Sequence, residues 1–376
     1  MVTLPYLRVR LAPIKNTSNP ALSFPPKKVS MGEGIAHLRI ELTTIQSPVD
    51  AAALGKLSEA YTLKISDRET TLRATSFVGA LRGLETFGQL VVYDGVRYVV
   101  PNLPIGVTDS PRFRHRGILL DTARHFFPVS DILRILDGMA MAKLNVLHWH
   151  IVDSQTFPFE SKKFPDLAKY GALAPSLVYS QTAIAEIVEY ALDRGVRIIP
   201  EFDLPGHTAS WGFAPSLQWA TTPCWKQVAS RPVLERAINV VSLDVTRTNV
   251  LSFVNDLLDE VMNVFPDPYL HLGGDEVIHK CWEEIPAIQA FKTTHRISNL
   301  QEWFTKKVLE HVNGRKTVIL WEEAYESGSM DQTPASVVNV WKNISIMHEA
   351  SRTHPILLSY GAYLDRTAPV DGQPTP

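Results

Sequence analysis

The sequence predicts an α/β protein: a (β/α)8-type TIM barrel that lacks its last strand, preceded by a small N-terminal α+β domain. Three observations predict this fold. Strand-like and helix-like segments alternate from about residue 112 onward, whereas residues 35–100 contain half-buried strands and one helix. Polar side chains also follow the later strands where these end, as in the active site of a barrel.

Composition places the chain among globular proteins. It has 376 residues, of which 45% are hydrophobic and 20% are charged, with a formal net charge of -2. This charge gives no broad basic field that would attract nucleic acid or an anionic membrane surface. Apolar runs stay shorter than the about 18 residues that a membrane span needs, and the first residues do not read as a signal peptide.

The chain divides into three predicted parts. Residues 1–30 are rich in proline, lysine and serine without periodicity, and they predict an irregular leader. Residues 31–108 predict the non-catalytic α+β domain, with alternating strands at 36–42 and 60–66 and a helix that begins near Phe77. Prolines mark the junction to residues 109–376, which predict the catalytic barrel, incomplete at its C-terminal end.

The barrel part contains seven predicted strands. Amphipathic helices lie between several of them, for example over 181–195, where Thr182 is a plausible N-cap, and over 250–265. An eighth strand would be needed for closure, and we expect none after Arg366. The strands are expected at 116–121, 145–153, 196–203, 269–276, 317–324, 336–341 and 355–360.

The sharpest chemical feature is the segment Gly273-Gly274-Asp275-Glu276 after the fourth strand. Two glycines let the backbone leave the pleat, and two adjacent carboxylates repel, so one pKa should rise and that group can act as a general acid. An isolated Asp-Glu pair is more often a solvated turn. This pair follows an apolar strand, which favours a catalytic role.

The other polar and aromatic residues at the strand ends could each have a functional or a purely structural role. Trp321 and Trp341 could form a wall for sugar rings or simply pack in the core. Arg116, Asp153 and Asp365 could bind sugar hydroxyls or form an internal ion-pair network. Together with the carboxylate pair, they favour a sugar-binding site.

A metal-dependent barrel hydrolase is the alternative. His148 and His150 share one face of a strand, and His207 could add a third ligand. Buried histidines satisfied by neighbouring groups are commoner, however, and the Gly-Gly-Asp-Glu segment has no role in that scheme. A serine hydrolase is less favoured still, because the sequence has no G-x-S-x-G motif.

Four motifs, in order, resemble the core motifs of family 20 glycoside hydrolases: RGILLDTARHF, LNVLHWHIVD, EFDLPGHTASWG and HLGGDEV. The resemblance covers roughly residues 35–366. It implies an exo-acting β-N-acetylhexosaminidase that removes terminal β-linked N-acetylglucosamine or N-acetylgalactosamine with retention, through substrate-assisted catalysis and an oxazolinium intermediate. It implies no cofactor and no metal.

The resemblance also implies residue roles. Glu276 matches the general acid, Asp275 the residue that orients the acetamido group, and Tyr363 the hydroxyl that holds its carbonyl. The further matches are Arg116 and Asp365 for the sugar hydroxyls, Asp153 and His207 for a network near the acid, and Trp321 and Trp341 for the walls.

The same resemblance extends to the setting of the protein. Cys224 and Cys281 match a pair that is disulfide-bonded in animal relatives, which implies an oxidising, secreted or lysosome- or vacuole-like compartment. The two N-x-S/T sequons, at Asn16 and Asn343, fit a glycoprotein. The expected partner is an oligosaccharide or glycoconjugate, from chitin fragments to glycoprotein or glycolipid glycans, and a homodimer is compatible with this reading.

The sequence departs from the family pattern in three places. Ala362 replaces an aromatic residue, Ser154 replaces an acidic one, and the last strand of the family is absent. These departures support the alternative that the chain is an inactive or carbohydrate-binding remnant of such an enzyme.

Overall fold

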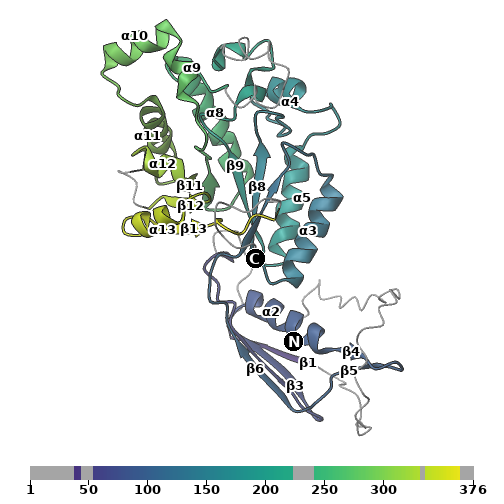
Figure 1. Ribbon diagram of the computed structural model, residues 1–376. Coiled ribbons are helices and arrows are strands. Elements are labelled where there is room, and N and C mark those ends of the chain that lie inside the picture. The colour runs from purple at the N-terminus through teal and green to yellow at the C-terminus, as the bar shows by residue number, and fades with distance from the viewer. Residues whose placement is uncertain (1–37, 44–53, 223–240, 331–334, 365–376) are drawn as a thin grey trace.

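The computed structural model describes residues 38–43, 54–222, 241–330 and 335–364 (Figure 1). The described strands form a four-stranded sheet, a seven-stranded sheet and a two-stranded hairpin. The predicted leader lies outside the described residues. Among the described residues, no helix combines the length and apolar character that a bilayer crossing requires.

The small sheet has the order β1-β3-β2-β6 (Leu38–Leu42, Thr70–Ala74, Tyr61–Ile65 and Ile105–Asp109). Helix α2 (Phe77–Leu90) packs on it, and the Ser76 hydroxyl caps its N-terminus by accepting a hydrogen bond from Gly79 N at 3.1 Å. A Cβ at Gly83 would lie 2.3 Å from Leu72 Cδ1, so glycine lets the helix approach the sheet closely. The hairpin of β4 (Val92–Tyr93) and β5 (Tyr98–Val99) projects from this part (Figure 1).

The large sheet confirms the predicted barrel-type fold. Its seven strands are all parallel, with neighbours in the order β13-β12-β11-β10-β9-β8-β7. Within the described residues β7 and β13 are its two edges. The strands are β7 (Gly117–Asp121), β8 (Val146–Val152), β9 (Arg197–Phe202), β10 (Tyr269–His271), β11 (Thr317–Trp321), β12 (Val337–Val340) and β13 (Ile356–Leu358).

Helices cover the outside of this sheet (Figure 1). The apolar stripe of α8 (Thr248–Val264) is buried in the main core, as its spacing predicts. The same holds for α5 (Gln181–Leu192), but its N-cap is Ser180, whose hydroxyl accepts from Ala183 N at 3.1 Å, rather than Thr182. The other helices that the structure describes are α3 (Val129–Met141), α4 (Pro165–Gly171), α9 (His279–Glu283), α10 (Pro286–His295), α11 (Leu300–Val312), α12 (Glu322–Glu326) and α13 (Ile344–Ala350), with the 3₁₀ turns Ala209–Gly212 and Gln218–Ala220.

Several predicted strands extend past the observed ones. The chain leaves β11 at Trp321 and enters α12 at Glu322, whereas the apolar run had predicted a strand to residue 324. Likewise β10 ends at His271, before the Gly-Gly turn. The acidic residues of these two segments therefore lie in the turn or helix after the strand and not in the strand itself.

A buried ion-pair network joins α2 to the base of the large sheet. Arg82 donates to Glu59 Oε2 at 2.7 Å and to the Gly195 carbonyl at 2.9 Å. Glu59 also accepts from Arg116 at 2.5 Å and from Asn145 at 2.8 Å. Because these charges are paired and hydrogen-bonded away from water, removing one partner would leave the other buried and uncompensated.

Candidate active site

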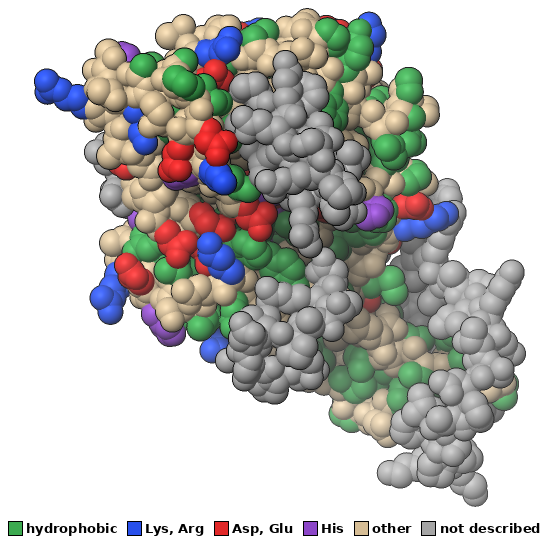
Figure 2. Space-filling model, turned by 45° about the horizontal axis from the view of Figure 1, so that its top comes forward, with side chains coloured by type: hydrophobic (Ala, Val, Ile, Leu, Met, Phe, Trp, Pro, Cys, Tyr) green, Lys and Arg blue, Asp and Glu red, His purple; other side chains and the backbone are tan. Residues whose placement is uncertain are grey.

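Titratable side chains meet within and just beyond the carboxyl-terminal parts of β8, β9 and β10. Parallel register places these ends at one edge of the sheet, so residues distant in sequence become neighbours. Figure 2 shows acidic side chains gathered near the centre of one face, with basic ones among them. The titratable side chains that meet at these strand ends are His148, His150, Asp153, Glu201, Asp203, His207, His271, Asp275 and Glu276.

The turn after β10 requires its glycines. Gly273 and Gly274 have φ angles of 63° and 93°, a region that L side chains rarely adopt. A Cβ at Gly273 would lie 1.9 Å from Asp203 Oδ1, so this position has no room for a side chain. Glu276 itself has φ 48°, an unfavourable value for a non-glycine residue, and such strain is commonly found at functional sites.

The two adjacent carboxyls lie in different environments. Glu276 is half-exposed, and its Oε2 lies 3.4 Å from His207 Nε2, a contact that holds the pKa of this carboxyl below its ordinary value. Asp275 is largely buried, and burial raises its pKa. The sequence predicts one raised pKa and assigns it to the general acid; the structure instead gives the raised pKa to Asp275, because Asp275 is the carboxyl that is withdrawn from water.

Asp153 connects two histidines. Its Oδ1 lies 3.2 Å from His207 Nδ1, and its Oδ2 lies 2.8 Å from His150 Nε2. Burial favours the neutral form of Asp153, but the hydrogen bonds to His150 and His207 outweigh it and hold the pKa of Asp153 far below its ordinary value. Burial likewise lowers the pKa of His207, yet its bonds to Asp153 and Glu276 raise it well above the usual value. The facing carboxylates therefore favour the charged form of both histidines, and they likewise raise the pKa of His150 against its burial.

Glu201 is the second centre of the network. Its Oε1 accepts from Trp321 Nε1 at 2.8 Å, and its Oε2 lies 2.7 Å from both His148 Nε2 and His150 Nδ1. Burial opposes the charge of Glu201, but the neighbouring histidines outweigh burial and keep its pKa well below the ordinary value. The chain of contacts from Trp321 through Glu201, His150 and Asp153 thus reaches His207, which lies beside Glu276.

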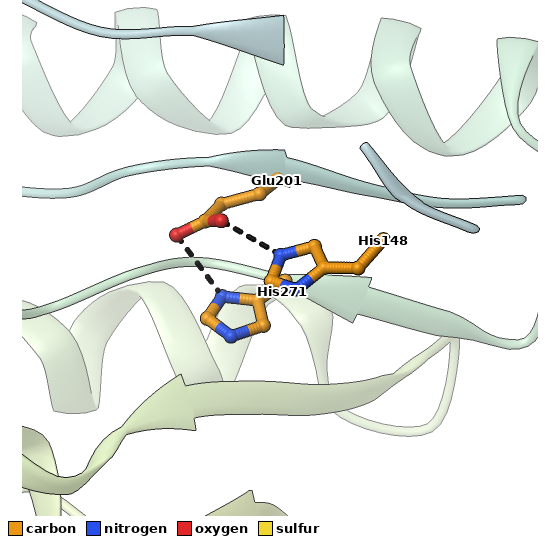
Figure 3. Close-up of side chains that lie close together, drawn as sticks. All are labelled: His148, Glu201 and His271. Atoms are coloured by element: carbon orange, nitrogen blue, oxygen red, sulfur yellow. Dashed lines mark hydrogen bonds and ion pairs between the residues drawn. The ribbon is translucent and has the colours of Figure 1, made fainter. Parts of the chain in front are cut away.

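The geometry favours hydrogen-bonded histidines over a metal centre. His148, Glu201 and His271 bring ligand atoms within 4.8 Å of one another, and Figure 3 shows the two rings beside the two oxygens of Glu201. However, His271 Nδ1 already accepts a hydrogen bond from Gly273 N at 3.0 Å, so the lone pair of this nitrogen is engaged. Among the described ligand atoms, no such group unites His148, His150 and His207, the set that the metal alternative requires.

Three aromatic side chains stand beside this network. The Trp321 and Trp341 ring centroids are 6.3 Å apart with planes at 65°, and the Trp341 and Tyr363 centroids are 6.2 Å apart. Trp341 Nε1 donates to Glu323 Oε2 at 3.0 Å, which fixes its ring. The predicted wall residues therefore lie together. Asp365 lies outside the described residues.

Comparison with known proteins identifies the family. The family model described as the catalytic domain of glycosyl hydrolase family 20 matches residues 113–375. The chain belongs to this family. A second family model, described as beta-acetyl hexosaminidase like, matches residues 6–90.

Family 20 relatives include the beta-hexosaminidase subunits beta of Mus musculus and Homo sapiens. Each is 40% identical over 331 residues, which cover 86% of this chain and 60% or 58% of the relative. The chain therefore spans less than two thirds of the length of these relatives. Among solved structures, chitobiase from Flavobacterium johnsoniae matches with a TM-score of 0.73 and 31% identity, over 88% of this chain and 50% of that chain. A Bacteroides fragilis beta-N-acetylhexosaminidase has the same fold, with a TM-score of 0.73 and 23% identity over 89% of this chain and 67% of that chain.

The predicted sugar ligand Arg116 is placed elsewhere by the structure. It lies before β7, at the base of the sheet, where it binds Glu59 and donates to the Lys143 carbonyl. Arg124, beyond the other end of β7, is the arginine of the site and pairs with Asp121 at 2.6 Å and Asp153 at 2.8 Å. Both arginines belong to the motif RGILLDTARHF. The rule that sites form after the carboxyl ends of strands would have selected Arg124.

The predicted cysteine pair is only partly described. Cys281 is buried in α9, in the segment after Glu276. Cys224 lies outside the described residues, so the pairing remains an expectation.

Proposed function

We propose that the protein is an exo-acting β-N-acetylhexosaminidase that removes terminal β-linked N-acetylglucosamine or N-acetylgalactosamine with retained configuration. One observation carries the proposal: a half-exposed Glu276 adjoins a largely buried Asp275, with the aromatic group Trp321, Trp341 and Tyr363 nearby. The names of the relatives, beta-hexosaminidase and chitobiase, support this substrate class.

Glu276 acts as the general acid. It reaches solvent, where a glycosidic oxygen can approach, and it is joined to Asp153 through His207. A bound sugar would exclude water from the Glu276 carboxyl, which favours its protonated form. In the first step the proton passes to the leaving-group oxygen while the bond from the anomeric carbon to that oxygen breaks.

The substrate supplies the nucleophile. The oxygen of its 2-acetamido group bonds to the anomeric carbon and forms an oxazolinium ion. Asp275 accepts the acetamido N–H and stabilises the positive charge, and the Tyr363 hydroxyl donates to the acetamido oxygen. Water then attacks the anomeric carbon, Glu276 takes its proton, and the acetamido group is restored. Adjacent carboxyls suit an acid with a helper better than two groups on opposite faces of a sugar.

The proposed setting follows from the same assignment. The substrates are oligosaccharides or glycoconjugates that end in an N-acetylhexosamine, including chitin fragments. We also propose a Cys224–Cys281 disulfide and a secreted or lysosome-like location. Non-reducing peptide mass spectrometry of the secreted protein would test the bridge, and two alkylatable thiols would contradict it.

The test of function measures how fast the full-length protein hydrolyses three nitrophenyl glycosides: the β-N-acetylglucosaminide, the β-N-acetylgalactosaminide and the β-glucoside. We expect hydrolysis of the β-N-acetylglucosaminide or the β-N-acetylgalactosaminide and little of the β-glucoside, which lacks the internal nucleophile. A thiazoline analogue of the oxazolinium ion should bind far more tightly than the free sugar. Efficient hydrolysis of the β-glucoside would contradict substrate assistance.

A carbohydrate-binding protein without turnover is the second candidate. The observation that favours it is in the sequence: Ser154 and Ala362 stand where the family pattern has an acidic and an aromatic residue. Tight thiazoline binding without hydrolysis of any N-acetylhexosaminide would support this candidate.

A further inference from the structure

Asp203 lies directly beneath the turn that carries Asp275. It follows β9, is 1% exposed, and accepts a hydrogen bond at Oδ1 from Gly274 N at 2.8 Å. The missing side chain of Gly273 leaves the space that this carboxyl fills. The backbone that leads into Asp275 is thus packed around the Asp203 carboxyl.

The remaining oxygens of the two carboxyls are buried without partners. Among the described residues, neither Asp203 Oδ2 nor Asp275 Oδ1 has a hydrogen-bond partner. Carboxylate oxygens of Asp203 and Asp275 lie within 4.8 Å of each other. Two anions at this separation in a buried site repel, whereas one proton between them satisfies both oxygens.

We propose that Asp203 is protonated in the working protein and donates a hydrogen bond to the Asp275 carboxylate, so that Asp203 is a positioning residue for the carboxylate that orients the acetamido group. This inference rests on the proposed function of Asp275. The cation of His207, whose Nε2 lies 3.6 Å from Asp275 Oδ2, keeps the charge on Asp275. Asp203 thereby fixes one oxygen of Asp275 and leaves the other for the substrate.

The electrostatics agree with this division of roles. Burial and the charge of Asp275 raise the pKa of Asp203 well above its ordinary value. Burial also raises the pKa of Asp275, but His207 and the hydrogen bond from Asp203 oppose that rise. The other titratable or charged groups that face the pair are Arg124, Asp153, Glu201, His207, Glu276 and Glu323.

The proton makes the site sensitive to alkali. As pH rises through the raised pKa, Asp203 ionises and repels Asp275, which then loses its fixed orientation. The stability of the fold should also fall as pH rises. Because the folded-state pKa of Asp203 is raised, its contribution is fully present below the unfolded-state value and is lost as pH rises through the folded-state value.

The test uses D203N and D203A in the full-length protein. Asparagine can accept from Gly274 N and donate to Asp275 without titrating. We expect D203N to keep kcat within a few-fold and to move the alkaline limb of kcat/KM to higher pH. We expect D203A, which lacks the donor, to lose about tenfold or more in kcat/KM. D203N as inactive as D203A, or with an unmoved alkaline limb, would overturn the proposal.

An infrared measurement separates this proposal from the proposed function. In wild-type protein with ¹³C-labelled aspartate carboxyls, we expect a protonated-carboxyl band at neutral pH that disappears in D203N. Labelling excludes the buried Glu322, whose pKa burial also raises. Absence of the band from the wild-type spectrum overturns the inference, even where the variants do not fold. A band in a protein that hydrolyses no N-acetylhexosaminide would support the proton and contradict the proposed function.

Discussion

At the scale of single residues, burial decides how the two adjacent carboxyls of the site differ. Asp275 and Glu276 are neighbours in sequence with equal formal charge, but one is withdrawn from water and the other faces His207 and solvent. Environment, not residue type, therefore separates the proposed helper carboxylate from the proposed general acid. The network behind them alternates carboxylates with histidines, so each of these buried carboxylates faces an imidazole ring.

Glu276→Gln should test the acid. We expect turnover of substrates with poor leaving groups to fall about 10²–10⁴-fold, because those leaving groups depend on protonation. Nitrophenyl substrates should lose less, since nitrophenolate leaves without a proton. Steady-state rates for a chitobiose-like and a nitrophenyl substrate measure the difference. Equal losses on both would contradict the role of Glu276.

Arg124 and Arg116 form a matched pair, because they flank the same strand. Arg124→Met removes a charged partner of Asp121 and Asp153 and should lower kcat/KM about 10–100-fold with little change in thermal stability. Arg116→Met leaves Glu59 with one fewer counter-charge and should lower stability while folded protein keeps its activity. Kinetics and thermal unfolding of both variants would show whether the two roles are reversed.

At the scale of elements, the Gly-Gly turn after β10 matters most. This turn carries the backbone closely over Asp203 and places Asp275 in the site. Its path requires positive φ angles at both glycines. The same strands that supply the core at one end thus release functional side chains at the other. Helix α12 contributes similarly, because Glu322 accepts from Trp341 N at 2.8 Å and holds the aromatic group in place.

Gly273→Ala should disrupt the turn. A methyl group would meet Asp203 and the residue would keep an unfavourable φ, so we expect a loss of about 1–3 kcal/mol in stability and most of the activity. Gly314→Ala is the control, because Gly314 also has positive φ but nothing lies within 4 Å of its added Cβ. Chemical denaturation and kinetics would compare them. Similar activity in both variants would mean that the space over Asp203 is not required.

At the scale of the whole molecule, the small sheet and the barrel-type sheet are joined through charge rather than apolar contact alone. Arg82 reaches from α2 to the backbone below β8 and β9, and Glu59 binds Arg82, Arg116 and Asn145. The joint lies at the opposite end of the sheet from the site. It can therefore hold the two parts together without touching the chemistry.

Arg82→Met should weaken this joint. Because it breaks a buried ion pair, we expect about 3–5 kcal/mol lower stability, against about 0.2–1 kcal/mol for Arg73→Met, which breaks an exposed pair with Glu41.

The pH dependence gives a second readout of the Arg82 joint. Burial opposes the charge of Glu59, but Arg116 and Arg82 lower its pKa below 4.5. Its stabilisation is therefore present above the unfolded-state value and is lost as pH falls through the folded-state value. Thermal unfolding of Arg82→Met and Arg73→Met, at pH values above and below the ordinary pKa of a glutamate, would measure the stabilisation that Glu59 contributes. Equal shifts in both variants would show that the joint does not stabilise the fold.

The sequence by itself determined the parallel strand order of the fold class, the apolar faces of α5 and α8, and the Gly-Gly-Asp-Glu turn. These are local patterns, in which spacing along the chain reports burial directly. Ordered motifs likewise indicated the family that the comparison then identified.

Only the tertiary structure decided which groups meet. It placed Arg124 rather than Arg116 at the site, revealed Glu201 as the link between Trp321 and the histidines, and set Asp203 against Asp275. It also assigned the raised pKa to Asp275 rather than Glu276. The physical reason is that pairing and desolvation depend on distances between strands far apart in sequence, which no local pattern encodes.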